Sequence, residues 1–360
     1  MAANDHSVSV AATLPSTIAE LVPPERLEGF FRRTVPHFFA VGPLSIALHA
    51  SDDRMLALAA GALEHARCAG PGPCHIRVAA IDAGRLGLPR PPAVPGTEHL
   101  RPPMDEVNLR AGGRIAAIHQ AGACAWESYD AASRTGLLLA ADAAAIMPWE
   151  WASPLKRLMA WATHDESFGL LHGAVIGDAR GGVMLAGTTG VGKSTTTAAA
   201  LLAGLSSAGD DLTMVARGPG DGLLAHAAFD SVKLSEDTLR LVGATALASA
   251  EATGPGLPKH ILRLSGLGAG RLAATVPLRA ILLPRLAGGP RSVITAGSKA
   301  AALKALGPVS GFVMRVTPDA SFALAARVVR QLPCFVLDLG DSPAEAARRI
   351  ATFIDRGEPG

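Results

Sequence analysis

The feature that most constrains the fold of this chain is a glycine-rich stretch, LAGTTGVGKSTT, at residues 185–196. Gly187, Gly192, Lys193 and Ser194 occupy the fixed positions of the pattern G-x-x-x-x-G-K-[ST]. An apolar run precedes the glycines, and a helix-forming run, STTTAAALLAGL, follows them. Backbone N–H groups of such a loop can converge on phosphate oxygens, and the following helix adds its positive N-terminal end. The stretch therefore predicts a strand, a phosphate-binding loop and a helix, in that order, within an α/β fold.

The same stretch predicts which groups would hold a nucleotide and its metal ion. Lys193 would neutralise the β- and γ-phosphates, and Ser194 would offer its hydroxyl to a Mg²⁺ ion that bridges them. ATP and Mg²⁺ are therefore the predicted cofactors. The predicted nucleotide-binding residues are Gly187, Thr188, Thr189, Gly190, Val191, Gly192, Lys193, Ser194 and Thr195.

Two adjacent acids, Asp210 and Asp211, follow the loop helix at the start of the next apolar run, LTMVAR. Beside a bound cation, one carboxylate can support the metal ion while the other accepts a proton from an incoming hydroxyl. Without a cation, the two carboxylates would repel each other and one would tend to keep its proton. A solvated helix-to-strand turn explains the same residues equally well.

Two further polar residues lie in apolar runs. His172, in LLHGAV, has the neighbours of a core histidine, a commoner role than catalysis for a histidine in such a run. Asp338, in CFVLDLGD, ends an apolar run as the metal-side acid of a P-loop ATPase would, but many apolar strands end in aspartate. Both roles stay open for each residue.

Composition excludes several classes of protein. The 360 residues are 49% hydrophobic and 18% charged, with a net charge of +2, so no basic stripe predicts a nucleic-acid partner. No uncharged apolar run reaches the roughly 18 residues of a membrane span. The N-terminal residues lack the basic start of an export signal and there are only four cysteines, so we expect a cytoplasmic protein. Cys68, Cys74 and His75 are too widely spaced for a typical zinc site.

The pattern of elements predicts two domains after a disordered start at residues 1–16. Residues 17–150 would form a smaller α+β domain that recognises a substrate or partner. It would hold a helix over 53–67 capped by Asp52, a proline-rich loop over 89–103, and strands at GRIAAIHQAG, ACAWESYD and TGLLLAAD.

Residues 151–357 would form the catalytic domain. We expect a helix over 151–164 and then a hairpin made of FGLLHGAVIG and VMLAG. Beyond the glycine-rich stretch, strands are expected at LTMVAR, PLRAILLPRL and CFVLDLG, and helices at SKAAALKALG, DASFALAARVVRQL and SPAEAARRIATFID.

The spacing of these motifs resembles the catalytic domain of the HPr kinase/phosphorylase family. His172 stands 15 residues before Gly187, and Asp210 stands 23 residues after it. The resemblance covers roughly residues 165–355 and is most specific in its first part. It implies a P-loop kinase core with a mixed sheet and flanking helices, of the type shared with phosphoenolpyruvate carboxykinases. It also implies transfer of the γ-phosphoryl group of ATP to a hydroxyl.

Carried onto this chain, the resemblance implies catalytic roles for His172, Lys193, Asp210 and Asp211. Ser194 would hold Mg²⁺ with Asp211 as the metal partner, and Asp210 would be the general base, although the two acids can exchange these roles. His172 would support the acidic pair. HPr kinases are oligomers, so the chain could also assemble with copies of itself.

Two residues depart from the family's pattern. Arg263 and Ser265, in ILRLSGLGAG, stand where HPr kinases carry a metal-binding glutamate and an arginine. We therefore expect no phosphorylase activity, and the chain is more similar to shorter HPr-kinase-like serine kinases. In segments shared with that group, Lys233, Lys259 and Arg285 are candidate phosphate or substrate contacts. Each could equally be a surface cation with a packed stem.

The predicted function is an ATP- and Mg²⁺-dependent kinase whose acceptor is a hydroxyl, with serine as the expected acceptor, on a peptide, a protein or a small molecule. Two alternatives remain. The chain could be a nucleotide-binding scaffold or sensor without productive transfer, or a P-loop ATPase that uses Asp338.

Overall fold

The structure is a computed structural model that describes residues 18–70, 76–97, 99–100, 106–111, 115–163, 167–247, 259–314 and 318–357. The predicted disorder of residues 1–16 and the positions of Cys74 and His75 lie outside these residues. Two compact units divide the chain. Unit 1 comprises Met1–His37, Ile46–Leu58 and Cys74–Ile146, and unit 2 comprises Phe38–Ser45, Ala59–Pro73 and Met147–Gly360.

Unit 1 is built on a mixed sheet whose strands follow the order β2-β4-β8-β7-β6-β5. The first three strands are parallel and the others antiparallel. Aromatic side chains of α2, including Phe30 and Phe31, pack with Trp126 of β7 in its core. Its elements are α1 (Ile18–Leu21), α2 (Pro24–Arg33), β2 (Leu44–Ala50), α3 (Asp53–Ala60), β4 (Ile76–Asp82), β5 (Glu106–Ala111), β6 (Ile115–Gln120), β7 (Ala125–Asp130) and β8 (Thr135–Ala140).

Most local predictions for this region are confirmed. The three predicted strands are β6, β7 and β8, and the described part of residues 89–103 contains no helix or strand. Asp52 caps α3, because its carboxylate accepts hydrogen bonds from the backbone N–H groups of Arg54 and Met55. The prediction that this helix runs to residue 67 is wrong. It ends at Ala60, before a glycine of low helix propensity. The predicted end of the helix instead forms β3 (Arg67–Cys68), which pairs antiparallel with β1 (His37–Val41).

Unit 2 contains a mixed sheet in the order β12-β10-β11-β17-β14-β13-β9, with β19 on β17 and β18 on β19. β11 and β19 run parallel to β17, and the other pairs are antiparallel. The strands are β9 (Gly169–His172), β10 (Ala174–Asp178), β11 (Gly181–Leu185), β12 (Ser207–Gly209), β13 (Leu212–Arg217), β14 (Leu223–Ala227), β17 (Thr275–Leu286), β18 (Val293–Ala296) and β19 (Cys334–Leu339).

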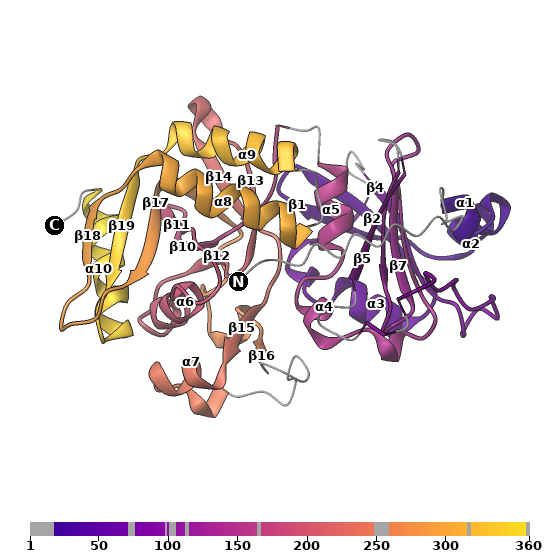
Figure 1. Cartoon of the computed structure of the whole chain (residues 1–360), viewed down its shortest axis with the longest axis horizontal. Helices are drawn as coiled ribbons and strands as arrows, with labels where there is room; N and C mark the ends of the chain where they lie inside the picture. Colours follow the sequence, from indigo (N-terminus) through magenta and orange to yellow (C-terminus); the bar gives the residue numbers. More distant parts are fainter. Residues whose placement is uncertain are drawn as a thin grey trace. The chain divides into compact units, whose positions relative to one another are not determined.

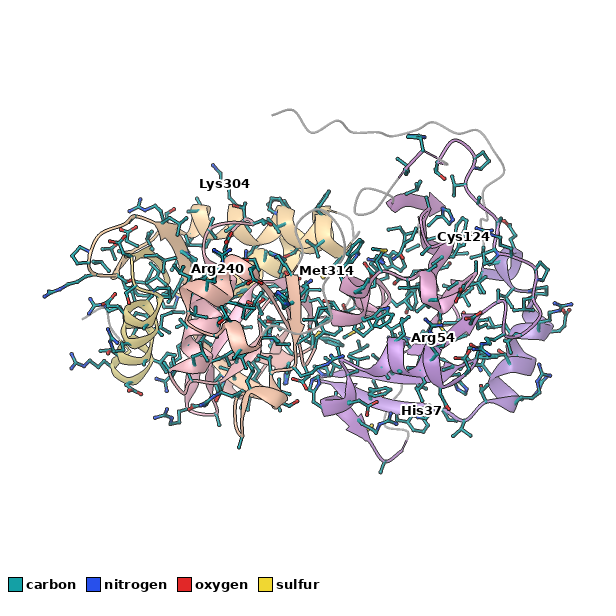
Figure 2. All side chains as sticks on the ribbon, turned by 90° about the horizontal axis from the view of Figure 1, so that it is seen from below. His37, Arg54, Cys124, Arg240, Lys304 and Met314 are labelled. Atoms are coloured by element: carbon teal, nitrogen blue, oxygen red, sulfur yellow. The ribbon has the colours of Figure 1, made fainter. Side chains whose placement is uncertain are left out.

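Helices cover both faces of this sheet (Figure 1). Since successive strand residues point to opposite faces, Met184 of β11 packs in a cluster with α8 (Lys299–Met314) and α9 (Pro318–Gln331). Its neighbours Val183 and Leu185 pack with α6 (Lys193–Leu202) and α10 (Pro343–Arg356). Charged side chains such as Lys304 lie on the outer surface (Figure 2). The prediction of an α/β fold with a mixed sheet and flanking helices is thus confirmed.

Two predictions in unit 2 need correction. The helix expected over 151–164 is two helices, α4 (Pro148–Ala152) and α5 (Lys156–Ala162), because Pro154 lacks an N–H group and disfavours a helical residue before it. The run FGLLHGAVIG is two strands with different partners. Its first part, β9, pairs with β13, and its second part, β10, pairs with β11 and β12.

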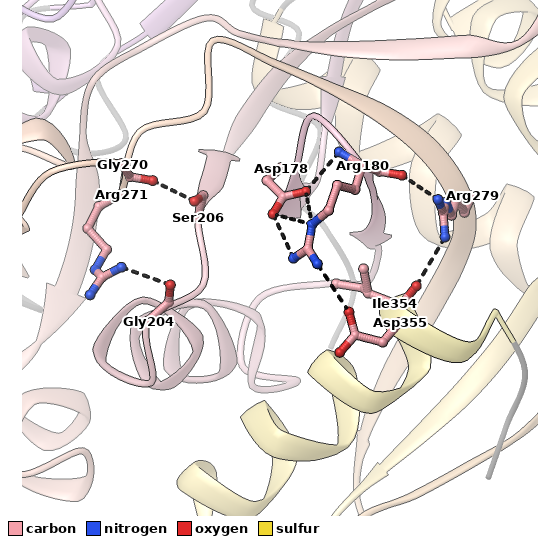
Figure 3. A network of polar contacts seen from close by, with 9 residues as sticks. All are labelled: Asp178, Arg180, Gly204, Ser206, Gly270, Arg271, Arg279, Ile354 and Asp355. Atoms are coloured by element: carbon pink, nitrogen blue, oxygen red, sulfur yellow. Dashed lines mark hydrogen bonds and ion pairs between the residues drawn. The ribbon is translucent and has the colours of Figure 1, made fainter.

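A polar network surrounds the turn between β10 and β11 in unit 2 (Figure 3). Arg180 in this turn binds Asp178 at 2.9 Å and Asp355 of α10 at 3.6 Å. Arg279 of β17 donates to the carbonyl oxygen of Ile354 at 3.1 Å. These contacts anchor the C-terminal end of α10 at the start of β11, and the glycine-rich stretch follows the other end of that strand. Among the described helices, none has the length and apolar character needed to cross a bilayer.

Candidate functional site

The glycine-rich loop connects β11 to α6, as its sequence predicts. Gly190 and Gly192 have φ values of +88° and +97°, which side chains with a Cβ rarely adopt. A Cβ on Gly192 would also lie 2.6 Å from a methyl carbon of Leu339 on β19. The backbone of this loop therefore requires glycine at both positions, and α6 begins directly after it with its N-terminal N–H groups open to a ligand.

Lys193 is buried at the first position of α6 and folds back over the loop. Its Nζ donates to the carbonyl oxygens of Gly187 at 2.7 Å and Thr188 at 3.0 Å. Burial lowers the pKa of Lys193, while the nearby carboxylates of Asp211 and Asp210 oppose this effect. The ammonium group thus sits among the loop's own carbonyls, where a bound phosphate would offer better acceptors.

Two strand changes bring the histidine and the acids together. β9 pairs with β13 so that His172 faces Leu212, and the N–H of Gly173 donates to the carbonyl oxygen of Asp211 at 3.0 Å. The chain passes from β9 to β10 at Gly173 and from β12 to β13 at Asp210 and Asp211. The acids and His172 consequently lie at the same point of the sheet, beside the N-terminal end of α6.

Asp211 is held by donors on both of its carboxylate oxygens. The Nε2 of His172 lies 2.9 Å from Oδ1, and the Nζ of Lys233 lies 2.7 Å from Oδ2. Burial raises the pKa of Asp211, but the charge of Lys233 and the hydrogen bond from His172 outweigh it, so the pKa lies well below its usual range. Asp211 is therefore ionised, and a metal ion bound directly to it would have to share these oxygens with Lys233 and His172.

Asp210 has the opposite environment. It is 3% exposed, and burial together with the charge of Asp211 raises its pKa to about 6, against a hydrogen bond from Ser194. Its Oδ1 has no hydrogen-bond partner among the described residues. A buried carboxylate that keeps one free oxygen can accept a proton or approach a cation.

A small ribbon brings two lysines to the acids. β15 (Val232–Ser235) and β16 (Lys259–Leu262) pair so that Ser235 faces Lys259. Because side chains alternate along a strand, Lys233 and Lys259 share one face of the ribbon, while Val232 and Leu234 pack against α6 and α7 (Glu236–Leu241) on the other. Burial lowers the pKa of Lys233, but the charge and hydrogen bond of Asp211, together with the charges of Asp210 and Glu150, raise it above its ordinary value, so this lysine keeps its charge.

Two cavities meet at these residues. The larger, of about 410 Å³, extends from the loop and the start of α6 to Leu241, Leu286 and Leu339. The smaller, of about 280 Å³, extends to Trp149 and Val313. Both cavities are lined by His172, Thr189, Ser194, Asp210, Asp211, Lys233 and Lys259. Of the predicted site residues, Gly190, Gly192, Lys193 and Thr195 line the larger cavity only.

Arg285 is not brought to either cavity. Its guanidinium group forms two hydrogen bonds with Asp338, at 2.6 and 2.8 Å, and its side chain is 67% exposed. Asp338 is thus neutralised by Arg285, a poor arrangement for a metal-side acid. Arg263 and Ser265 also lie away from the cavities, since both hydrogen-bond to Asp230.

Several contributors to this region were not predicted from the sequence, and three of them lie around the smaller cavity and His172. Trp149 and Val313 line the smaller cavity, and the hydroxyl of Ser310 on α8 accepts a hydrogen bond from the backbone N–H of His172 at 2.9 Å. Trp149 lies five residues before Pro154 in a short helix, and no spacing relates it to the glycine loop. Its position depends on packing between segments far apart in the sequence.

The residues present fit a magnesium ion that a nucleotide brings with it. Within the described part of the chain, no three His, Cys, Asp or Glu side chains form a group that could hold a metal ion alone. Ser194 supplies a hydroxyl beside the carboxylate of Asp210, and Mg²⁺ usually takes its remaining ligands from phosphates and water.

Comparison with solved structures finds a weak likeness to a kinase/phosphatase. No protein-family model and no curated protein matches the chain. The structure of the HPr(Ser) kinase/phosphatase from Coxiella burnetii matches at 14% identity with a TM-score of 0.23. The match covers 32% of this chain and 63% of that one, so the chain spans less than two thirds of its neighbour's length. At this TM-score we base no conclusion on the likeness.

Proposed function

We propose that this chain is an ATP- and Mg²⁺-dependent kinase that transfers the γ-phosphoryl group to a hydroxyl. The observation that carries the proposal is the environment of Asp210. This buried carboxylate touches Ser194 of the glycine loop, has a free oxygen, and has a pKa of about 6. A base with a pKa near the working pH can take a proton from an alcohol, as phosphoryl transfer to a hydroxyl requires.

Each neighbouring residue has a distinct part in this reaction. Lys193 and the loop would bind the phosphates, and Ser194 would hold Mg²⁺ together with phosphate oxygens and water, so that the charge of the ion would stabilise the migrating phosphoryl group. Asp211, fixed by His172 and Lys233, would stay ionised, keep the pKa of Asp210 raised, and set the position of Lys233. We assign Asp210 as the base and Asp211 as a positioning residue rather than a direct metal ligand.

Transfer of label from γ-labelled ATP to serine-containing acceptors tests this function. Asp210→Asn should lower the transfer rate by about 10²- to 10⁴-fold, because a general base contributes that much, while ATP binding is kept. Asp237→Asn, at an exposed acid of α7, is the matched control and should transfer as the wild type does. Full transfer by both Asp210→Asn and Asp211→Asn would contradict the mechanism.

The same assay separates the alternatives. Tight ATP binding without transfer to any acceptor would favour a scaffold or sensor. Release of phosphate to water that is lost in Asp338→Ala but kept in Asp210→Ala would favour a P-loop ATPase. The ion pair of Asp338 with Arg285 is the reason we do not expect the second result.

A further inference from the structure

The two cavities divide the residues around the acids into two sides. The larger cavity is lined by the loop glycines Gly190 and Gly192 and by Lys193, so a triphosphate would lie on this side. The smaller shares the acids, His172 and both lysines but lacks Lys193, and it ends at Trp149 and Val313. Asp210 lines both cavities, so a group in the smaller cavity would reach Asp210 from a side that the loop glycines do not line.

Trp149 is held in place by contacts of the residues that follow it in the sequence. The carboxylate of its neighbour Glu150 binds the Nζ of Lys156 at 2.9 Å and the guanidinium group of Arg157 at 2.9 Å. All three side chains are buried, and Arg157 is 0% exposed. The hydroxyl of Ser231 donates to the carbonyl oxygen of Ala152, which ties the end of α4 to the segment just before β15. The wall that carries Trp149 is therefore joined to the strand that carries Lys233.

The chemistry of the smaller cavity defines what it can take. One end offers an indole ring and Val313, and the other offers carboxylates, hydroxyls and ammonium groups. A fitting molecule has an apolar or planar body at one end and a hydroxyl at the other. The volume of about 280 Å³ lies just below the roughly 300–1,000 Å³ of sites for drug-sized ligands. One unit of the size of an amino acid fits that description.

We infer that the smaller cavity is the acceptor subsite, that Trp149 is its specificity-determining residue, and that the acceptor is an amino-acid-sized alcohol of the serine type. The inference rests on the proposed function. The acceptor oxygen bonds to the γ-phosphorus as its proton moves to Asp210. The bond between that phosphorus and the β,γ-bridging oxygen breaks, and its electron pair leaves with ADP.

Binding without turnover provides the first test. With Mg²⁺ and a non-hydrolysable ATP analogue present, N-acetyl-L-serinamide is titrated while tryptophan fluorescence is recorded. We expect a saturable change in the wild type and its loss in Trp149→Phe. Trp151→Phe is the matched control, because Trp151 lies in the same helix but lines neither cavity, and it should keep the change.

Steady-state transfer provides the second test. Trp149→Ala should raise the KM for N-acetyl-L-serinamide at least about tenfold, the loss of one well-packed aromatic contact, and leave the KM for ATP within about twofold. Trp149→Phe should recover most of the acceptor affinity. Parallel assays with free L-serine and with a serine-containing peptide distinguish a small-molecule acceptor from a residue of a chain.

The two tests separate the inference from the proposed function. Transfer whose acceptor KM does not change in Trp149→Ala, or a change in the KM for ATP alone, overturns the inference and leaves the kinase standing. A Trp149-dependent binding signal without transfer to any acceptor supports the cavity as a binding site and overturns the kinase. The absence of both signals overturns both.

Discussion

Two acids of unit 2, Glu150 and Asp210, are almost equally buried, at 7% and 3% exposure, yet their electrostatic environments are opposite. Burial raises the pKa of both. Around Glu150, the charges of Arg157 and Lys156 outweigh burial and lower the pKa to about 2. Around Asp210, the adjacent charge of Asp211 adds to burial, and the pKa rises to about 6.

The difference separates a structural ion cluster from a chemical one. Glu150 is paired with two cations, so its ionisation does not change near neutral pH. Asp210 instead keeps an oxygen without a partner among the described residues, beside a cavity and the loop hydroxyl of Ser194. A chain maintains an unsatisfied buried carboxylate at a cost in stability, and such groups concentrate where a ligand or a proton completes them.

The largest effect is expected from breaking the satisfied cluster. Glu150→Gln removes the negative charge and leaves Lys156 and Arg157 buried without it, so unfolding should become easier by about 4 kcal/mol. Denaturant unfolding of the variant measures this loss. Asp178→Asn, in the exposed pair with Arg180, is the control and should change stability far less. Equal losses in both variants would show that burial does not set the difference.

A substitution at Asp210 is expected to change stability in the opposite direction and to stabilise the folded protein. Its folded pKa is raised above the ordinary value of 3.8, so wild-type stability is lost as pH rises through about 6. Asp210→Asn removes this cost. Two pKa units correspond to about 3 kcal/mol, and because the new amide is itself buried we expect a gain of about 2 kcal/mol near pH 8.

Melting curves of the Asp210→Asn variant and the wild type near pH 8 and near pH 4 measure this effect. Most of the gain should be lost at the lower pH, because folded Asp210 is then protonated and unfolded Asp210, with its ordinary pKa of 3.8, is protonated in part. A destabilised Asp210→Asn variant near pH 8 would mean that the carboxylate is satisfied and unstrained in the folded protein.

The contrast between these clusters also shows what sequence can reveal. The glycine loop was predictable because its strand, loop and helix are contiguous and their backbone requirements are local. For Asp210 and Asp211, the sequence shows only two adjacent acids, and a solvated turn explains them as well as a catalytic pair does. The register of β9 on β13, which places His172 beside Asp211, is a long-range pairing that no local pattern encodes.

Trp149 and Arg285 show where local patterns fail. The prediction of one helix over 151–164 missed the break at Pro154. It therefore also missed the short helix that brings Trp149 to the smaller cavity. The apolar neighbours of Arg285 in the sequence favour a phosphate or substrate contact, but side chains alternate along β17. Leu286 therefore lines the larger cavity, and Arg285 meets Asp338 instead.

The pH dependence of the transfer rate tests whether Asp210 is the base. If Asp210 is the base, the rate should fall about tenfold per pH unit below about pH 6, because protonation removes the reactive form. Asp211→Asn should move this limb to lower pH, since it removes the neighbouring negative charge that helps raise the pKa of Asp210. A pH–rate profile of each protein measures the shift. An acid limb that stays in place in Asp211→Asn would assign the titration to another group.

The smallest effect is expected at Arg285. Its ion pair with Asp338 lies on the exposed side of β17, where water screens the charges and long side chains lose entropy when they pair. Arg285→Ala should therefore leave the melting temperature and the transfer rate nearly unchanged, as measured beside Lys233→Ala in the same assays. Lys233→Ala should lower the rate strongly, because Lys233 contacts Asp211 at the junction of the two cavities. A large loss of transfer in Arg285→Ala would mean that Arg285 leaves Asp338 and enters the site when nucleotide binds, so that the exposed pair belongs to the chemical cluster after all.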